Sequence, residues 1–303
     1  MNVIVICFMT IFYILTGSHA CPIKKENKDG LEERDIIYTG KHDIVKIYSS
    51  LYLLYKQQNR VKDRIVFFAE ADTNSDGSKV DKGLYVMIDN STTKLLDNTN
   101  DIAGDGTGKV FFATNDGVYA YNPEEGRAYK YGHLEEKIIS LAAENNTGVI
   151  YALTDNHIMY KITENGNKSD VDDRVKYARE IFIDWFDNLY YYDDRNIYVV
   201  GDKDATKITG LPDNPASIKP IIKPPEEEAI VFLLNDDVLY NVYSNGTTII
   251  SQDSASLRSK LHTQIKPTAY SFDLYLVVYF AHDKKIYEIN VVAKIIDDIF
   301  CNH

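Results

Sequence analysis

The stretch NDIAGDGTGKVFFATNDGVYAY, residues 100–121, decides the fold of this chain. Its apolar run at 110–113 and its alternating run at 118–121 are rich in β-branched and aromatic residues. The turn sequence Asn115-Asp116-Gly117 lies between them. Two short runs of this kind, joined by a tight turn, predict an antiparallel β-hairpin.

The same pattern returns along the chain. Five further copies lie at 63–87, 145–162, 186–200, 226–242 and 273–289, and the first has a longer turn. Aligning the hairpins makes six residues equivalent: Phe67, Phe111, Tyr151, Tyr190, Val231 and Tyr279. A repeat of roughly 40–45 residues with four short strands per unit is typical of a β-propeller.

We therefore predict an all-β chain folded as a six-bladed β-propeller of four-stranded blades. The blades are expected at 42–97, 98–132, 133–171, 172–211, 212–253 and 254–297. An extra strand at 35–39 precedes the first blade, and we expect this N-terminal strand to complete the last blade and close the ring. Pro-rich segments fall between units, where strand-breaking residues are expected.

The segment 1–20 has the pattern of a secretory signal peptide. An apolar run at 3–15 is followed by Ser18-His19-Ala20, whose small residues suit a cleavage site. The run is short for a membrane-spanning helix, although an uncleaved anchor is the alternative. We expect a secreted, extracellular protein with a single propeller domain at 21–303.

The composition of the chain narrows the range of possible functions. The chain carries a formal net charge of −12, which argues against nucleic acid and anionic membranes as partners. Its seven histidines show no metal-ligand spacing, and no Gly-x-Ser-x-Gly sequence occurs. We predict no catalytic residue, no metal and no cofactor, although catalytic carboxylates among 45 acidic residues remain an alternative.

Covalent modifications are predicted from the secreted context. Cys7 leaves with the signal peptide, so the mature chain keeps Cys21 and Cys301, one near each end, and we expect them to form a disulfide. Four Asn-x-Ser/Thr sequences lie in predicted turns or loops and are candidate glycosylation sites: Asn90, Asn145, Asn167 and Asn245.

One turn resembles the start of a calcium loop. Residues 72–77 read Asp-Thr-Asn-Ser-Asp-Gly, with Asp72 and Asp76 as the acids, but Gly83 stands where that motif needs a bidentate glutamate. A polar hairpin turn without metal explains the same residues, and we prefer that interpretation.

A propeller's central funnel is lined by the starts of its innermost strands. The hairpin alignment places six residues there: His42, Asn100, Ser140, Arg179, Lys219 and Lys266. This set has up to three cations and no acid, which predicts a pocket for an anionic, planar or sugar-like small molecule. Trp185 is expected on the opposite rim, as a packed residue rather than one that stacks on a ligand.

The unit REIFIDWFDNLYYYDD, residues 179–194, resembles the inner strands of the regucalcin and gluconolactonase group of six-bladed propellers. That resemblance implies a divalent metal held by a Glu, an Asn and an Asp. Arg179 stands at the position of the metal-binding Asp, and Ser140 is its equivalent in the preceding unit. A metal-dependent lactonase or hydrolase is therefore the alternative function rather than the preferred one.

The layout of the mature chain resembles the ommochrome-binding proteins of moth and butterfly haemolymph. The shared features are a terminal cysteine at each end and the tyrosine-rich repeats VFFAT, IYALT and LYYYD. The resemblance implies a non-enzymatic carrier of a flat, carboxylate-bearing pigment related to xanthommatin. A protein-binding surface is a third, weaker expectation, and the sequence names no protein partner.

Arg179 carries the sharpest expectation of the ligand hypothesis. A guanidinium in the funnel would bind a pigment carboxylate through a charge-assisted contact. The competing interpretation is structural, in which Arg179 pairs with a neighbouring acid such as Glu180 or Asp184.

Overall fold

A computed structural model describes residues 31–49, 65–212, 219–222, 230–235, 238–250, 267–272, 277–290 and 293. The predicted signal peptide, the cysteines Cys21 and Cys301, and Lys266 lie outside the described residues. Within the described part, no helix combines the length and the apolar character needed to cross a membrane.

The regular secondary structure of the described chain consists almost entirely of short strands. In chain order they are β1 (Ile36–Thr39), β2 (Asp43–Ser49), β3 (Ile65–Thr73), β4 (Lys79–Ile88), β5 (Ser91–Leu96), β6 (Thr99–Gly104), β7 (Val110–Thr114), β8 (Gly117–Asn122), β9 (Arg127–Lys130), β10 (Ile138–Ala143), β11 (Ile150–Thr154), β12 (Met159–Thr163), β13 (Lys168–Val171), β14 (Glu180–Ile183), β15 (Leu189–Tyr192), β16 (Ile197–Val200), β17 (Ala205–Lys207), β18 (Lys219–Ile222), β19 (Ile230–Asn235), β20 (Val238–Tyr243), β21 (Thr248–Ile250), β22 (Ala269–Phe272), β23 (Val277–His282) and β24 (Lys285–Asn290). Two single-turn 3₁₀ helices, η1 (Glu33–Asp35) and η2 (Glu164–Gly166), accompany them.

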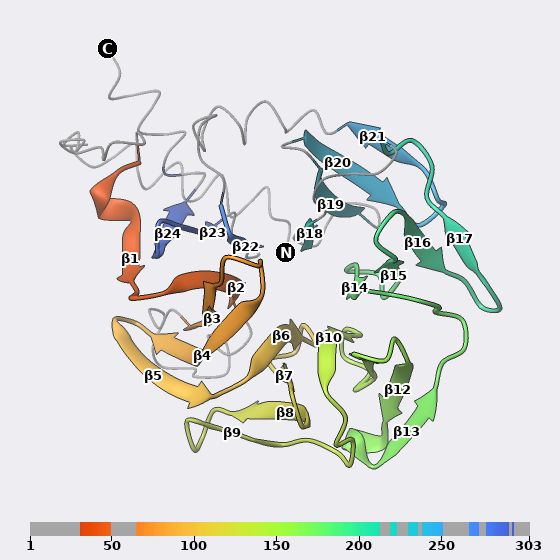
Figure 1. Cartoon of the computed structure of the whole chain (residues 1–303), viewed down its shortest axis with the longest axis horizontal. Helices are drawn as coiled ribbons and strands as arrows, with labels where there is room; N and C mark the ends of the chain where they lie inside the picture. Colours follow the sequence, from red (N-terminus) through yellow and green to blue (C-terminus); the bar gives the residue numbers. More distant parts are fainter. Residues whose placement is uncertain are drawn as a thin grey trace, which may run out of the picture.

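These strands form four-stranded antiparallel sheets. Five sheets use consecutive strands, β2 to β5, β6 to β9, β10 to β13, β14 to β17 and β18 to β21, and the sixth has the order β1-β24-β23-β22. Figure 1 shows the sheets arranged about a common centre, with the first strands β2, β6, β10, β14, β18 and β22 innermost. The fold is therefore all-β and propeller-like.

The repeat predicted from sequence matches the strands. Each of the six aligned residues lies on the second strand of its sheet, on β3, β7, β11, β15, β19 and β23. The strand expected at 35–39 also pairs as predicted: β1 lies antiparallel to β24, with Ile36 opposite Tyr287 and Thr39 opposite Lys285.

The second strands whose side chains are described, β3, β7, β11, β15 and β23, are mostly buried on both faces, which explains their apolar runs. Every residue of β7 is buried. Phe111 packs with Ile138 and Ile150 of the next sheet, whereas Phe112 packs with Phe67 of the preceding one. Side chains alternate along a strand, so neighbouring residues fill the two interfaces between successive sheets.

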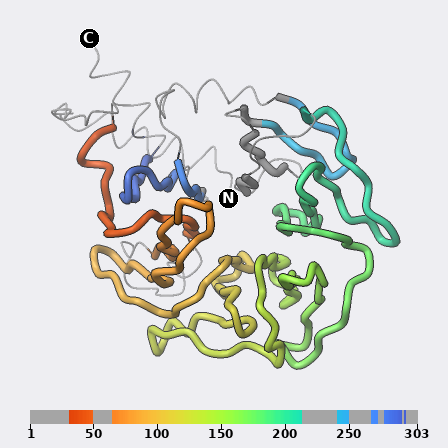
Figure 2. The backbone as a smooth tube through the Cα atoms, in the orientation of Figure 1, coloured from red at the N-terminus to blue at the C-terminus, as the bar shows by residue number. Residues whose placement is uncertain are grey.

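The β3–β4 hairpin differs from the expected long turn. Its strands have nine and ten residues, compared with five and six in β7 and β8. After an irregular step between Glu70 and Ala71, pairing continues as far as Thr73 opposite Lys79. Residues expected to form a turn are therefore an extension of the two strands, and Figure 2 draws their tip, in orange, close to the centre.

Candidate functional site

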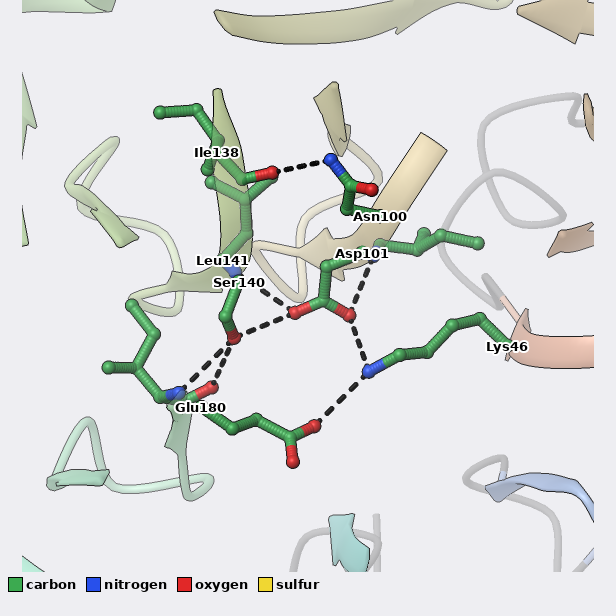
Figure 3. A network of polar contacts seen from close by, with 9 residues as sticks. Lys46, Asn100, Asp101, Ile138, Ser140, Leu141 and Glu180 are labelled. Carbon is green, nitrogen blue, oxygen red and sulfur yellow. Dashed lines mark hydrogen bonds and ion pairs between the residues drawn. The ribbon is translucent and has the colours of Figure 1, made fainter. Parts of the chain in front are cut away.

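One register position recurs in the innermost strand of every sheet. To find it, we count two positions on from the aligned aromatic or valine residue in each second strand. The innermost-strand residue that pairs opposite this position is the one that recurs. We call these residues the central positions: Lys46, Asp101, Ser140, Glu180, Pro220 and Ala269. Figure 3 shows that Lys46, Asp101, Ser140 and Glu180 meet in one network of polar contacts.

This register corrects the predicted lining of the centre. Of the predicted residues only Ser140 is a central position, while Asn100, Arg179 and Lys219 each precede one by a single residue. Irregular steps, each with an extra unpaired residue, interrupt β2, β6 and β10 but are absent from the pairings of β14 and β18. Counting a fixed number of residues along each repeat cannot account for these bulges, because each one shifts the register by one residue.

The expectation of an acid-free centre was consequently wrong. Two of the central positions, Asp101 and Glu180, are acids, and they lie directly after the predicted Asn100 and Arg179. Lys46 is the third charged member, and it lies further along the same strand segment than the predicted His42. The centre therefore has mixed charge rather than a cluster of cations.

Lys46 joins the two acids. Its Nζ lies 2.9 Å from Oδ1 of Asp101 and 3.1 Å from Oε1 of Glu180. Burial works to lower the pKa of Lys46, but the negative charges of Asp101 and Glu180 outweigh it and raise that pKa well above its usual value. The Lys46 ammonium is therefore a fixed charge at the centre, held by strands from two other sheets.

Asp101 and Ser140 extend the network from Lys46 to buried polar groups. The Ser140 hydroxyl donates to Oδ2 of Asp101 at 2.9 Å and accepts a hydrogen bond from the backbone N–H of Ile181 at 3.2 Å. The backbone N–H of Leu141 also donates to Oδ2 of Asp101, at 3.0 Å. Both Asp101 and Ser140 are buried, so each polar atom is matched, as buried polar groups require. Ser140, a predicted ligand residue, thus links β6, β10 and β14.

The side chain of Asn100 also links neighbouring elements. Its side-chain Nδ2 donates to the backbone oxygen of Ile138 at 2.8 Å and to Oδ1 of Asn115 at 3.1 Å. These contacts join the start of β6 to the next sheet and to the turn between β7 and β8. Both are contacts within the protein, one of them to backbone.

Arg179 directly precedes the innermost strand β14, and its side chain makes ionic and hydrogen-bonded contacts. Its Nε lies 2.7 Å from Oδ2 of Asp194, and one terminal nitrogen lies 3.0 Å from Nε2 of His157. Nδ1 of His157 donates to the backbone oxygen of Ala178 at 2.7 Å, which leaves Nε2 as the acceptor for Arg179. The acid that pairs with Arg179 is thus Asp194, on the β15–β16 turn, rather than Glu180 or Asp184.

His42 lies beside the extended hairpin. Its Nδ1 donates to Oδ1 of Asp72 at 2.8 Å, and Nζ of Lys82 lies 3.2 Å from the other oxygen. These hydrogen bonds from His42 and Lys82 lower the pKa of Asp72. In the turn beyond, Asp76 accepts hydrogen bonds from Ser78, and Asn74 donates to the Ser78 hydroxyl. The acids of the calcium-like sequence therefore have protein partners.

Lys219 begins β18, opposite Leu234, and only its backbone is described. Lys266 lies outside the described residues. Among the described residues, no group of three or more His, Cys, Asp or Glu side chains is arranged to hold a metal ion.

The four predicted glycosylation sites differ in exposure. Asn90, Asn167 and Asn245 are exposed. Asn145 is half-buried, and its Nδ2 donates to the backbone oxygen of Trp185 at 2.7 Å. Trp185 itself is 37% exposed in the turn after β14, at the end of that strand opposite Arg179.

A sequence signal for Asp101 and Glu180 does exist. Asp101 lies two residues before buried Ala103, so it shares a strand face with a core residue. Glu180 is likewise two residues before buried Phe182. An acid on the inward face of a strand is unusual enough to mark it for a partner, but the partner Lys46 lies 134 residues from Glu180.

Comparison with known proteins concerns the fold. No family model matches the chain, and no curated protein matches it. One similar structure is PorZ, an essential surface component of the type-IX secretion system of Porphyromonas gingivalis, at 10% identity and a TM-score of 0.49. The match covers 84% of this chain but only 38% of PorZ.

A second similar structure is a protein of unknown function from Bacteroides thetaiotaomicron. It is 12% identical with a TM-score of 0.53, over 82% of this chain and 69% of that one. Identities this low concern the fold alone. The class that the fold defines is thus an all-β, propeller-like protein with a mixed-charge network on its innermost strands.

Proposed function

We propose that this chain is a secreted, non-catalytic carrier that binds a small aromatic molecule at the centre of a single propeller domain. The observation that carries the proposal is the network of Lys46, Asp101 and Glu180, which brings both signs of charge together from the innermost strands β2, β6 and β14. A ligand that bears an amino-acid group has matching charges of both signs. The resemblance to ommochrome-binding proteins supports a pigment of the xanthommatin type as that ligand.

We further infer that the six sheets are six blades of one ring, closed by β1. Several contacts support this inference. Ile44 and Phe68 of the first sheet pack with Tyr279 and Ile286 of the last sheet in one apolar cluster. The Thr268 hydroxyl also donates to the backbone oxygen of Ile44 at 2.6 Å. A closed ring buries the apolar faces of the first and last sheets against each other, as it does for the other neighbouring sheets.

The alternative function is a metal-dependent hydrolase of the lactonase type. Its favouring observation is the convergence of two carboxylates, Asp101 and Glu180, close to Asn100. However, the Lys46 ammonium bridges those carboxylates and neutralises part of their charge. A divalent cation would have to displace it, and for that reason we favour the carrier.

Colour separates the two functions. Protein isolated from its native fluid is expected to carry an absorbing ligand, identified by absorption and mass spectra after extraction, and to contain no stoichiometric metal. A colourless protein with one bound divalent cation and lactone-hydrolysing activity would overturn the carrier proposal.

A titration tests where the ligand binds. Xanthommatin is expected to bind the wild-type protein, and Lys46→Met is expected to weaken binding because Asp101 and Glu180 then lose their shared counter-ion. Lys109→Gln, at the other end of the innermost strands, is the matched control. Equal affinity in wild type and Lys46→Met would contradict a central site.

A further inference from the structure

Asn145, in the turn between β10 and β11, contacts the turn between β14 and β15 of the next sheet. Its backbone N–H donates to Oδ1 of Asp187 at 2.7 Å, and its side-chain Nδ2 donates to the backbone oxygen of Trp185 at 2.7 Å. On the other side, Gly106 of the β6–β7 turn lies against Oδ1 of Asn145, where a side chain would clash. The carboxamide of Asn145 is therefore held in one orientation beside Trp185.

The β14–β15 turn is itself fixed by a buried carboxylate. Oδ1 of Asp184 accepts hydrogen bonds from the backbone N–H groups of Phe186 at 2.9 Å and Asn188 at 3.0 Å. The other oxygen of Asp184 accepts a hydrogen bond from the Tyr190 hydroxyl at 2.8 Å. Side-chain bonds of this kind to nearby backbone define the conformation of a turn, so residues 185 and 186 have fixed positions.

Two aromatic side chains of this fixed turn are exposed to solvent. Trp185 is 37% exposed and Phe186 is 55% exposed. Among the exposed large apolar residues of the described ranges, these two alone are adjacent in sequence. They form a small aromatic surface, which we call the Trp185–Phe186 pair, next to the carboxamide of Asn145.

Asn145 is also the acceptor residue of an Asn-x-Thr sequence, which the exposed Thr147 completes. An N-linked glycan replaces one of the two hydrogens on the side-chain nitrogen, and the amide keeps the other. The hydrogen bond from Nδ2 to the Trp185 backbone oxygen is therefore compatible with glycosylation. The first sugar is then attached to an atom that contacts the turn carrying the aromatic pair.

Two other candidate glycosylation sites bond within their own turns. Nδ2 of Asn167 donates to the backbone oxygen of Glu164 at 2.9 Å. Oδ1 of Asn245 accepts hydrogen bonds from the backbone N–H and the hydroxyl of Thr247, at 3.0 and 2.7 Å. These bonds lead to no aromatic side chain of a neighbouring sheet, in contrast to the contact of Asn145 with Trp185.

We propose that Asn145 is glycosylated and that its first N-acetylglucosamine packs on the Trp185–Phe186 pair. A pyranose ring has an apolar face of C–H groups, and packing that face on aromatic rings removes apolar area from water. The inference rests on the secreted location given in the proposed function, because N-linked glycans are added to secreted chains.

Fluorescence tests the contact directly, because Trp185 is the only tryptophan of the chain. Protein secreted by a eukaryotic host is expected to carry a glycan at Asn145, identified by mass spectrometry of glycopeptides. Trimming with endoglycosidase H leaves the first sugar and should keep Trp185 protected from acrylamide quenching. Complete removal with peptide N-glycosidase F should increase the quenching and shift the emission to longer wavelength.

Variants of the acceptor sequence provide a matched test. Thr147→Ala abolishes the acceptor sequence but keeps Asn145, so its Trp185 should be quenched like that of the fully deglycosylated protein. Thr147→Ser keeps the acceptor sequence and should behave like wild type. Thr92→Ala, which removes the acceptor sequence of Asn90 instead, should leave the Trp185 signal unchanged.

The outcomes separate this inference from the proposed function. An unmodified Asn145 in the secreted protein refutes the inference and leaves the carrier proposal standing. Equal quenching before and after complete removal of the glycan, or loss of protection on trimming to the first sugar, also refutes it. A chain that stays inside the host cell without glycans contradicts the secreted location as well.

Discussion

Arg179 uses two of its guanidinium nitrogens for contacts within the protein. Its pair with Asp194 is half-exposed, with side-chain exposures of 51% and 56%. Ion pairs of that kind contribute about 0–1 kcal/mol, because water screens them and ordering two long side chains costs entropy. The contacts favour the structural interpretation over a part in ligand binding.

We therefore expect Arg179→Ala to lower the free energy of unfolding by at most about 1 kcal/mol. Xanthommatin affinity should stay within about twofold of wild type, because no pigment contact is lost. Chemical unfolding and titration of the folded variant measure the two effects. Arg195→Ala, in the same turn, is the control. An affinity loss of roughly 1.5–3 kcal/mol at unchanged stability would instead support a carboxylate contact.

Asp172 and Arg174 form a more buried pair. Nε and a terminal nitrogen of Arg174 lie 2.9 and 2.6 Å from the two oxygens of Asp172, whose side chain is 8% exposed. Burial tends to raise the pKa of Asp172, but the hydrogen bonds and charge of Arg174 outweigh it and lower that pKa. A second terminal nitrogen donates to the backbone oxygen of Gly201 at 3.0 Å.

This pair predicts a pH dependence of stability. Because the folded pKa of Asp172 is depressed, its stabilisation is present above the unfolded value near 4 and is lost as pH falls through the folded value. Arg174→Gln should lower the free energy of unfolding by about 1–3 kcal/mol at neutral pH. The variant should also lose less stability between about pH 5 and 2. Urea unfolding across that range measures both effects.

The control for the pH prediction is an exposed pair. Arg127 pairs with Glu125, at side-chain exposures of 72% and 49%. Arg127→Gln should leave both the neutral stability and its pH dependence close to wild type. A profile for Arg174→Gln that runs parallel to wild type at every pH would contradict the linkage.

At the scale of elements, β7 shows how strands hold adjacent sheets together. Phe112 is fully buried, and its ring centroid lies 5.7 Å from that of Phe67 in the preceding sheet. Tyr121 contacts Phe67 edge-on at 5.0 Å. Apolar surface between the sheets is thus closely packed, and the surrounding residues relax only partially around a cavity made there.

Phe112→Ala is expected to lower the free energy of unfolding by about 3–5 kcal/mol, the usual cost of truncating a buried phenylalanine. Denaturant unfolding checks the value. Tyr129→Ala, on the outer strand β9 where the residue is 46% exposed, should change stability by less than about 0.5 kcal/mol. Similar losses in the two variants would show that the interface between these sheets is not the main source of stability.

The length of the strands in the β3–β4 hairpin could not be predicted from the local sequence. The sequence DTNSDG marks a turn, and a turn does form at 74–78. Asp72 was expected to belong to that turn, yet it pairs opposite Val80 within the ladder. Contacts of Asp72 with His42 and Lys82 stabilise that extension, and neither contact can be inferred from local composition.

At the scale of the whole molecule, two segments far apart in the chain meet in one sheet. Ile36 of β1 pairs opposite Tyr287 of β24. Cys21 precedes Ile36, and Cys301 follows Tyr287, each by a stretch of chain long enough to span the short distance between paired strands. The predicted disulfide is therefore compatible with the sheet.

We expect Cys21 and Cys301 to be bonded in the mature protein. A link that closes a loop of about 280 residues contributes about 5 kcal/mol by the chain-entropy estimate, so reduction should lower the melting temperature. Peptide mapping under non-reducing conditions identifies the bond directly. Recovery of both cysteines alkylated without prior reduction would contradict it.

The sequence by itself determined the repeat, the four-stranded units and the pairing of the N-terminal strand with β24. The repeat follows from local patterns, since β-branched and aromatic runs and Asn-Asp-Gly turns act within one hairpin. The pairing of the N-terminal strand follows from the repeat itself, because the last unit needs an outer strand that its own segment does not supply. The six aligned residues, from Phe67 to Tyr279, all lie on second strands, which carry the apolar run of each repeat.

Only the tertiary structure decided which side chains meet at the centre. A slip of one residue turns the opposite face of a strand inward, and the extra residues in β2, β6 and β10 make that slip differ from sheet to sheet. Glu180 therefore faces the centre, while Arg179 pairs with Asp194. Lys46 contacts Glu180 across 134 residues of chain, a separation over which sequence pattern carries no register.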